Sequence, residues 1–153
     1  MDLSGRLFGE REDGARVGLF VDGPNVFREE FDVDLDDVRQ IGESYGRLAA
    51  TRLYVDENAS PGLIQAAEAR GFEVVTTSGD VDVRLAVDAT EAVVAGRIDE
   101  LIVVSRDTDF KPAMEIAARE GVQTVALAPG EHGRSDALGN AAHDALSLHG
   151  DVE

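Results

Sequence analysis

The fold is decided by one stretch of sequence, Val17-Gly18-Leu19-Phe20-Val21-Asp22-Gly23-Pro24-Asn25. Its apolar run is typical of a strand that is buried on both faces, as strands are in a parallel sheet. The run ends directly on Asp22 and then on a glycine and a proline, which are typical turn residues. In open α/β sheets the carboxyl ends of the strands face the crevice that binds ligands. We therefore expect Asp22 to lie in a ligand-binding crevice.

Two further stretches carry aspartates in comparable places. The apolar run Leu101-Ile102-Val103-Val104 is followed by Ser105-Arg106-Asp107-Thr108-Asp109-Phe110, and Asp82 lies in Gly79-Asp80-Val81-Asp82-Val83. Carboxylates that meet at one edge of a sheet repel each other unless a cation joins them, and Mg²⁺ and Mn²⁺ prefer such oxygen ligands. The pattern predicts a Mg²⁺ or Mn²⁺ site that acts on phosphate, formed by Asp22, Asp82, Asp107 and Asp109.

Each of these aspartates also has a simpler interpretation, because the chain contains 17 of them. Asp22 could serve only the turn before Gly23. Asp109 could only cap the following helix, and Asp82 could only favour a helix dipole. The positions of Asp22, Asp107 and Asp109 directly after two apolar strands favour the metal site over these alternatives.

Short apolar runs alternate with helical patterns from residue 16 onward. Strands are expected at 16–22, 50–55, 72–76, 100–105 and 122–127. Helices are expected at 25–30, 34–45, 61–70, 81–95, 109–120 and 135–148. Regular alternation of this kind implies a parallel sheet with right-handed crossovers. We predict an α/β fold, a three-layer α/β/α sandwich whose five-stranded parallel sheet has the order 3-2-1-4-5.

The composition is that of a single folded domain. The chain has 153 residues, of which 43% are hydrophobic, too many for a disordered chain. We expect residues 1–15 to form a flexible N-terminal tail and residues 16–149 to form the domain. No run approaches the ~18 apolar residues of a membrane span, and no signal peptide is visible, so a cytoplasmic location is expected. The lack of cysteine excludes disulfides and thiolate metal sites.

The charge is strongly acidic. The formal net charge is −17, and 13 of the 14 basic residues are arginines, Lys111 being the only lysine. An acidic, lysine-poor surface suggests a halophilic protein, because at ~1 M salt the Debye length of ~3 Å screens self-repulsion. Net negative charge usually argues against a nucleic-acid partner. In molar salt that argument weakens, because counterion release contributes little and a metal-bridged phosphate contact survives.

Taken together, the motifs resemble the NYN domain family, a branch of the PIN-like nucleases. The segments that carry the resemblance are Val21-Asp22-Gly23-Pro24-Asn25, Gly79-Asp80-Val81-Asp82-Val83 with Leu85-Ala86-Val87-Asp88, and Ser105-Arg106-Asp107-Thr108-Asp109-Phe110. It covers roughly residues 16–148 and is strongest to an archaeal group of uncharacterised NYN proteins. The resemblance implies a Rossmann-like PIN fold and metal-dependent ribonuclease activity on RNA.

The resemblance also implies roles for individual residues. The acidic cluster becomes both catalytic and metal-binding, and Asn25, Arg106 and Ser135 become substrate-binding residues. Arg106 has two open interpretations: it binds RNA, or it pairs with Asp107 or Asp109 and weakens metal binding. The expected function is single-strand RNA endonuclease activity, in which a metal-activated water hydrolyses the phosphodiester. No nucleotide cofactor is expected, and a homodimer is compatible with the family.

Other functions remain as alternatives. The chain could be a catalytically weak PIN-like module that binds RNA or protein. A phosphatase of the Asp-x-Asp type fits less well, because Asp22 is followed by Gly23-Pro24. A Toprim-like domain would place a glutamate where Asp22 stands, and a receiver-like domain would place a lysine where Ala128-Pro129-Gly130 follows the fifth strand.

Overall fold

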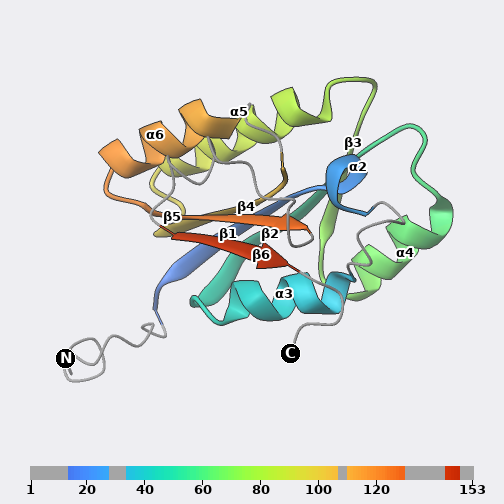
Figure 1. Cartoon of the computed structure of the whole chain (residues 1–153), viewed down its shortest axis with the longest axis horizontal. Coiled ribbons are helices and arrows are strands. Elements are labelled where there is room, and N and C mark those ends of the chain that lie inside the picture. Colours follow the sequence, from blue (N-terminus) through green and yellow to red (C-terminus); the bar gives the residue numbers. More distant parts are fainter. Residues whose placement is uncertain (1–13, 28–33, 107–109, 130–143, 149–153) are drawn as a thin grey trace.

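The computed structural model describes residues 14–27, 34–106, 110–129 and 144–148 (Figure 1). Within these ranges the chain alternates between strands and helices almost without exception. In chain order the elements are β1 (Arg16–Asp22), α2 (Gly23–Val26), α3 (Leu35–Glu43), β2 (Arg47–Asp56), α4 (Pro61–Ala69), β3 (Glu73–Thr77), α5 (Val81–Val94), β4 (Glu100–Val104), α6 (Lys111–Arg119), β5 (Gln123–Pro129) and β6 (Asp144–Leu148).

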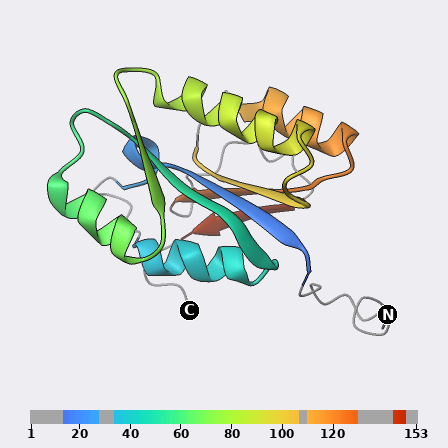
Figure 2. The same cartoon turned by 180° about the vertical axis from the view of Figure 1, so that it is seen from behind.

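The strands form one sheet in the order β3-β2-β1-β4-β5-β6, and every neighbouring pair is parallel. Helices α5 and α6 cover one face, while α3 and α4 cover the other, as both views show (Figures 1 and 2). The predicted three-layer α/β architecture and the predicted order 3-2-1-4-5 are therefore confirmed. Strand β1 is central and pairs with β2 on one side and β4 on the other, so the switch point of the sheet lies between β1 and β4.

The last predicted helix is wrong over its final residues, which form a strand. Helix was expected to continue from residue 135 to residue 148, but Asp144–Leu148 is strand β6 and pairs in parallel with β5. Residues 130–143 lie outside the described part of the chain. Without β6, the backbone N–H and C=O groups on the outer edge of β5 would be unpaired. Pairing with β6 gives these groups hydrogen-bond partners. This pairing between distant segments overrides the local apolar spacing from which a helix was predicted.

Alternating side chains divide the core into two layers. Leu19 and Val21 point to the α3 and α4 side, whereas Phe20 and Tyr54 point to the α5 and α6 side. All four side chains are fully buried. The rings of Phe20 and Tyr54 are stacked with centroids 6.2 Å apart, which adds a directional aromatic contact to the burial of apolar area.

Helix ends follow the local signals in the sequence. The Ser60 hydroxyl accepts a hydrogen bond from the Leu63 amide at 3.1 Å, and Pro61 occupies the first helical turn. Gly71 ends the same segment with φ of 88°, a left-handed conformation that glycine adopts at little cost. The main boundary differences are small: β2 begins at Arg47 rather than at residue 50, and α2 begins at Gly23 rather than at Asn25.

The turn after β1 lies directly against β2. A Cβ atom at Gly23 would stand 2.6 Å from the backbone oxygen of Tyr54 and 3.0 Å from a methyl group of Val55. The carbonyl of Gly23 also accepts a hydrogen bond from the Phe27 amide at 2.9 Å. Glycine is therefore required here for close approach, and this contact sets the distance between the β1 turn and the end of β2.

Replacing Gly23 with alanine should destabilise the fold, because the new methyl group meets a backbone atom that cannot rotate away. We expect Gly23→Ala to lower the unfolding free energy by about 1–3 kcal/mol, measured by urea denaturation. Gly62→Ala in α4 is the matched control, since its nearest neighbouring atom is 4.0 Å away and alanine favours helix by roughly 0.5–1 kcal/mol. Equal stability of the two variants would contradict the close approach.

Candidate active site

A cavity of about 330 Å³ opens at the carboxyl ends of β1 and β2, beside the start of α5. Its lining is dominated by acidic side chains from three different elements. The lining residues are Asp22, Pro24, Asn25, Asp56, Gly79, Asp80, Val81 and Asp82. The cavity thus lies at the edge of the sheet where ligands bind in open α/β folds, and four carboxylates line it.

Asp22 is fixed in place at the end of β1. It is only 4% exposed. Its Oδ1 atom accepts a hydrogen bond from the Asn25 amide at 3.3 Å, and its Oδ2 atom accepts one from the hydroxyl of the buried Ser105 at 3.2 Å. Asp22 therefore caps α2 and also lines the cavity, so its role in the turn leaves the predicted role in the site open. Because Ser105 follows β4, its hydroxyl ties the ends of the two central strands to each other.

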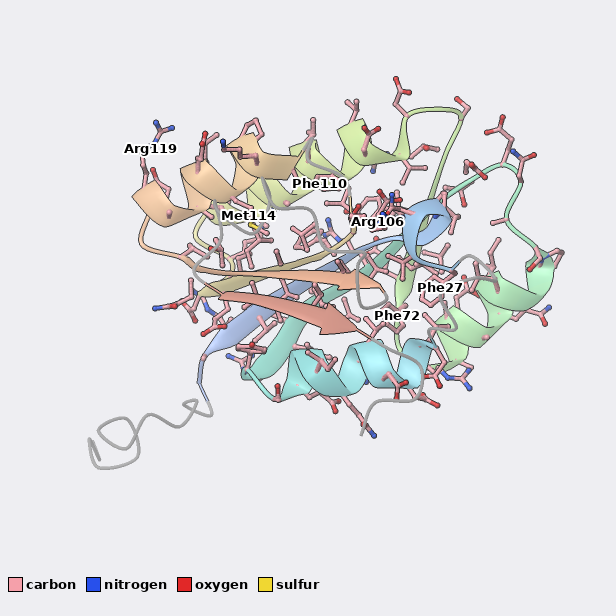
Figure 3. All side chains as sticks on the ribbon, viewed as in Figure 1. Phe27, Phe72, Arg106, Phe110, Met114 and Arg119 are labelled. Carbon is pink, nitrogen blue, oxygen red and sulfur yellow. The ribbon has the colours of Figure 1, made fainter. Side chains whose placement is uncertain are left out.

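Asn25 connects the same two loops. Its side-chain Oδ1 atom accepts a hydrogen bond from the backbone amide of Arg106 at 2.7 Å. Figure 3 shows Arg106 beside α2, in agreement with this bond. Since the amide oxygen is engaged in the fold, the Asn25 contribution to a phosphate contact would come from the N–H donors of its amide group.

The start of α5 supplies two of the four carboxylates. Asp82 lies in the first turn of the helix, partly buried, and its Oδ1 atom accepts a hydrogen bond from the Val83 amide at 2.9 Å. Asp80 occupies the N-cap position, but its side chain makes no capping hydrogen bond. The structure therefore brings Asp82 to the same cavity as Asp22, even though the two residues are 60 positions apart in the sequence.

Two cavity residues, Asp56 and Asp80, were not predicted as part of the site. Asp56 ends β2 just as Asp22 ends β1, directly after the buried run Leu53-Tyr54-Val55. The same strand-end signal that identified Asp22 could have found it, given that β2 is the neighbour of β1. The Asp56 carboxylate also accepts a hydrogen bond from the Asn58 amide at 2.9 Å.

The structure describes two of the four aspartates in the predicted cluster, Asp22 and Asp82. Asp107 and Asp109 lie outside the described residues, as does Ser135. Over the described ranges, no group of three or more histidine, aspartate or glutamate side chains is arranged to hold a metal ion. The carboxylates of Asp22 and Asp82 are hard oxygen donors of the type that Mg²⁺ and Mn²⁺ prefer, so the chemistry fits, and the complete cluster stays a prediction.

Asp88, four residues from Arg84 on α5, lies at the centre of a separate polar network. Its Oδ2 atom accepts a hydrogen bond from the Tyr54 hydroxyl at 2.8 Å and one from Arg84 Nε at 3.1 Å. Arg52 Nη1 lies 3.7 Å from the same oxygen. Burial is the largest cause that raises the pKa of Tyr54; an interaction with Arg52 opposes it, and the hydrogen bond and charge of Asp88 add to it.

The sheet order defines a Rossmann-like α/β domain, and its acidic cavity lies at the carboxyl ends of β1 and β2, the edge at which open α/β sheets bind ligands. The chain belongs to the NYN domain family, whose profile matches residues 16–149. This family consists of PIN-like nucleases, so the resemblance seen in the sequence motifs is confirmed.

Two known proteins are similar over most of the chain. The uncharacterized protein MJ0482 of the archaeon Methanocaldococcus jannaschii is 41% identical over 139 residues, which cover 91% of this chain and 58% of that protein. The chain therefore spans less than two thirds of the length of this curated relative. The crystal structure of VPA0982, a protein of unknown function from Vibrio parahaemolyticus, has a TM-score of 0.75 at 21% identity and covers 90% of this chain and 95% of its own. The second likeness supports the fold alone.

No helix in the described segments is long and apolar enough to cross a membrane.

The raised pKa of Tyr54 makes a prediction about alkaline stability. Because the folded pKa lies above the unfolded value of about 10, the folded protein keeps a proton that the unfolded chain loses. The stability from this group is present below about pH 10 and is lost as the pH rises further. Urea unfolding across this range should show a steeper fall for the wild type than for Tyr54→Phe.

Tyrosinate absorbance gives an independent check of the same prediction. The chain has two tyrosines, so a Tyr45→Phe background isolates the signal of Tyr54. We expect Tyr54 to stay protonated above pH 10 for as long as the protein stays folded. Ionisation at the ordinary tyrosine pKa in the folded protein would contradict the buried hydrogen-bonded hydroxyl.

Proposed function

We propose that this NYN domain is a metal-dependent ribonuclease that cleaves single-stranded RNA internally. The observation that carries the proposal is the position of Asp22: buried, held by two hydrogen bonds, and on the same cavity as Asp82. A carboxylate fixed in this way needs little reorganisation to bind a cation. Membership of a PIN-like nuclease family supports phosphodiester hydrolysis as the reaction.

Charge supports a cation as a partner of this cavity. A phosphate 4 Å from one carboxylate meets a repulsion of about 1 kcal/mol in bulk water and about 4 kcal/mol near a protein surface. The cavity presents four carboxylates, so RNA cannot approach it favourably on its own. A divalent cation reverses the sign of this interaction, because it attracts both the carboxylates and the phosphate.

In the proposed site, Asp22 and Asp82 hold Mg²⁺ or Mn²⁺ together with Asp107 and Asp109. The bound ion would supply a Lewis acid that activates water and neutralises the charge of the scissile phosphate. The hydroxyl of Ser105 and the backbone N–H of Asn25 each donate a hydrogen bond to one oxygen of the Asp22 carboxylate, which keeps both oxygens oriented. These two residues are thereby expected to fix where the ion binds relative to the sheet.

The proposed RNA contacts come from the loops beside the cavity. Asn25 lines the cavity, and its bond to the Arg106 backbone places the loop after β4 next to it. We assign Asn25 and Arg106 to phosphate binding, and Ser135 to the same group by its match to the family motif. Arg106 is exposed and carries a guanidinium, the side-chain group that best matches phosphate geometry.

The proposal predicts metal-dependent cleavage that requires both aspartates. We expect labelled single-stranded RNA to be cut in molar KCl with Mn²⁺ or Mg²⁺. Asp22→Asn and Asp82→Asn should each lower kcat by more than about a hundredfold, above the range typical of residues that only support metal ligands. Asp36→Asn is the matched control, since Asp36 pairs with Arg70 at the surface, outside the cavity lining.

Three outcomes separate the alternatives in this experiment. Equal cleavage by the wild type and by Asp22→Asn would mean that the activity belongs to another site or to a contaminant. RNA binding without turnover, with or without metal, would favour the binding module over the nuclease. Release of internal fragments rather than single nucleotides is the result expected of an endonuclease.

The acidic charge predicts salt-dependent stability. The formal net charge is −17, and self-repulsion on this scale weakens the folded state at low ionic strength. We expect the midpoint of thermal unfolding to rise from low salt to molar KCl, where the Debye length is only about 3 Å. KCl should raise this midpoint by much more than an uncharged osmolyte does at the same water activity. Equal stability at low and molar salt would exclude a halophilic protein.

A further inference from the structure

Tyr54 lies against the turn after Asp22 through its backbone and contacts helix α5 through its side chain. We propose that Tyr54 is a positioning residue that, through its hydrogen bond to Asp88, sets the place of Asp82 relative to Asp22. The inference rests on the proposed function for the identity of the site. It concerns a residue that lines none of the cavity itself.

The backbone of Tyr54 is fixed to the β1 side of the cavity. Tyr54 is the register partner of Asp22 in the parallel pair of β1 and β2. Its carbonyl oxygen lies where a Cβ atom at Gly23 would come within 2.6 Å. Tyr54 therefore cannot shift without moving the turn that follows Asp22.

The side chain of Tyr54 is fixed to the α5 side. The ring is fully buried and stacked on Phe20, so it has little freedom to turn. Its hydroxyl donates to Asp88 Oδ2 at 2.8 Å. Arg84 binds both oxygens of Asp88, at 3.1 Å and 3.2 Å, which holds the carboxylate facing the tyrosine.

Helix α5 transmits this contact to the cavity. Asp88 lies six residues after Asp82 on one continuous helix, about 9 Å along its axis. The buried residues of α5 are all apolar, namely Val81, Leu85, Ala89, Ala92 and Val93. Apolar contacts are not directional, so they permit the helix to slide or rotate slightly. The hydrogen bond between Tyr54 and Asp88 is directional and selects one position.

The position of α5 matters because the cavity is built from both sides. Asp22 belongs to the sheet and Asp82 belongs to the helix. A shift of α5 against the sheet changes the separation of the two carboxylates, to which metal affinity is sensitive. Residues that support metal ligands from outside typically change affinity or activity by 10- to 100-fold when removed.

The test compares Mn²⁺ affinity in the wild type, Tyr54→Phe, Asp88→Ala and Asp88→Asn. Mn²⁺ binding is followed by electron paramagnetic resonance in molar KCl, and Asp22→Asn identifies the part of the signal that belongs to the cavity. We expect Tyr54→Phe and Asp88→Ala to weaken Mn²⁺ binding by about tenfold, the lower end of the range for supporting residues. Asp88→Asn should restore much of this loss, since an amide oxygen still accepts the tyrosine hydroxyl.

Glu91→Gln is the matched control on the same helix. Glu91 forms an exposed ion pair with Arg97 at the far end of α5, so its loss should leave Mn²⁺ affinity unchanged. Tyr54→Phe keeps the stacked ring, and thermal unfolding checks that the variant is folded. With RNA and subsaturating Mn²⁺, the positioning variants should lose kcat while KM for RNA stays near the wild-type value.

The experiment distinguishes failure of the positioning role from failure of the proposed ribonuclease function. Wild-type Mn²⁺ affinity in both folded Tyr54→Phe and Asp88→Ala would overturn the positioning role. If Tyr54→Phe fails to fold, equal Mn²⁺ affinity of Asp88→Ala and Asp88→Asn would overturn it instead. A wild type that binds Mn²⁺ without cutting RNA would refute the ribonuclease but not the positioning role. A wild type that binds no Mn²⁺ would refute both.

Discussion

The parallel pairing of β1 with β2 and with β4 is the constraint on which the rest of the structure depends. It buries β1 from Val17 to Asp22 between two neighbouring strands and two helical layers. Because parallel strands end at the same edge, this pairing brings the ends of β1, β2 and β4 together. The acidic cavity and the loop with Ser105 and Arg106 follow from that geometry.

Carboxylates grouped at that edge repel one another, which costs free energy. Hydrogen bonds from nearby groups offset part of this cost. Asp22 is the most buried of the four, and hydrogen bonds hold both of its oxygens. Asp56 and Asp82 each accept a backbone N–H bond. These bonds stabilise each charge separately, but they do not remove the repulsion among the four. A divalent cation would do so, which is the physical link between this fold and the chemistry proposed for the NYN domain.

Much of the fold could be predicted because its signals are local. Short apolar runs that alternate with helical patterns predicted five strands, and their order is the one observed. The position of Asp22 at the cavity could be predicted for the same reason, since Asp22 ends an apolar strand. Asp56 carries an equal signal, because it ends the buried run of β2. The helix expected up to residue 148 failed because backbone pairing with β5, a non-local contact, decides the conformation of β6.

The sequence by itself determined the first five strands, the helices between them and the acidic motif at the end of β1. Each depends on residues within one or two turns of each other, where periodicity and turn chemistry act directly. The tertiary structure alone decided that the Asn25 side chain accepts a hydrogen bond from the backbone amide of Arg106, 81 residues away. It also decided that Tyr54 meets Asp88 across 34 residues. Such contacts leave no periodic trace in the chain, because they arise only when strands pair and helices dock on the sheet.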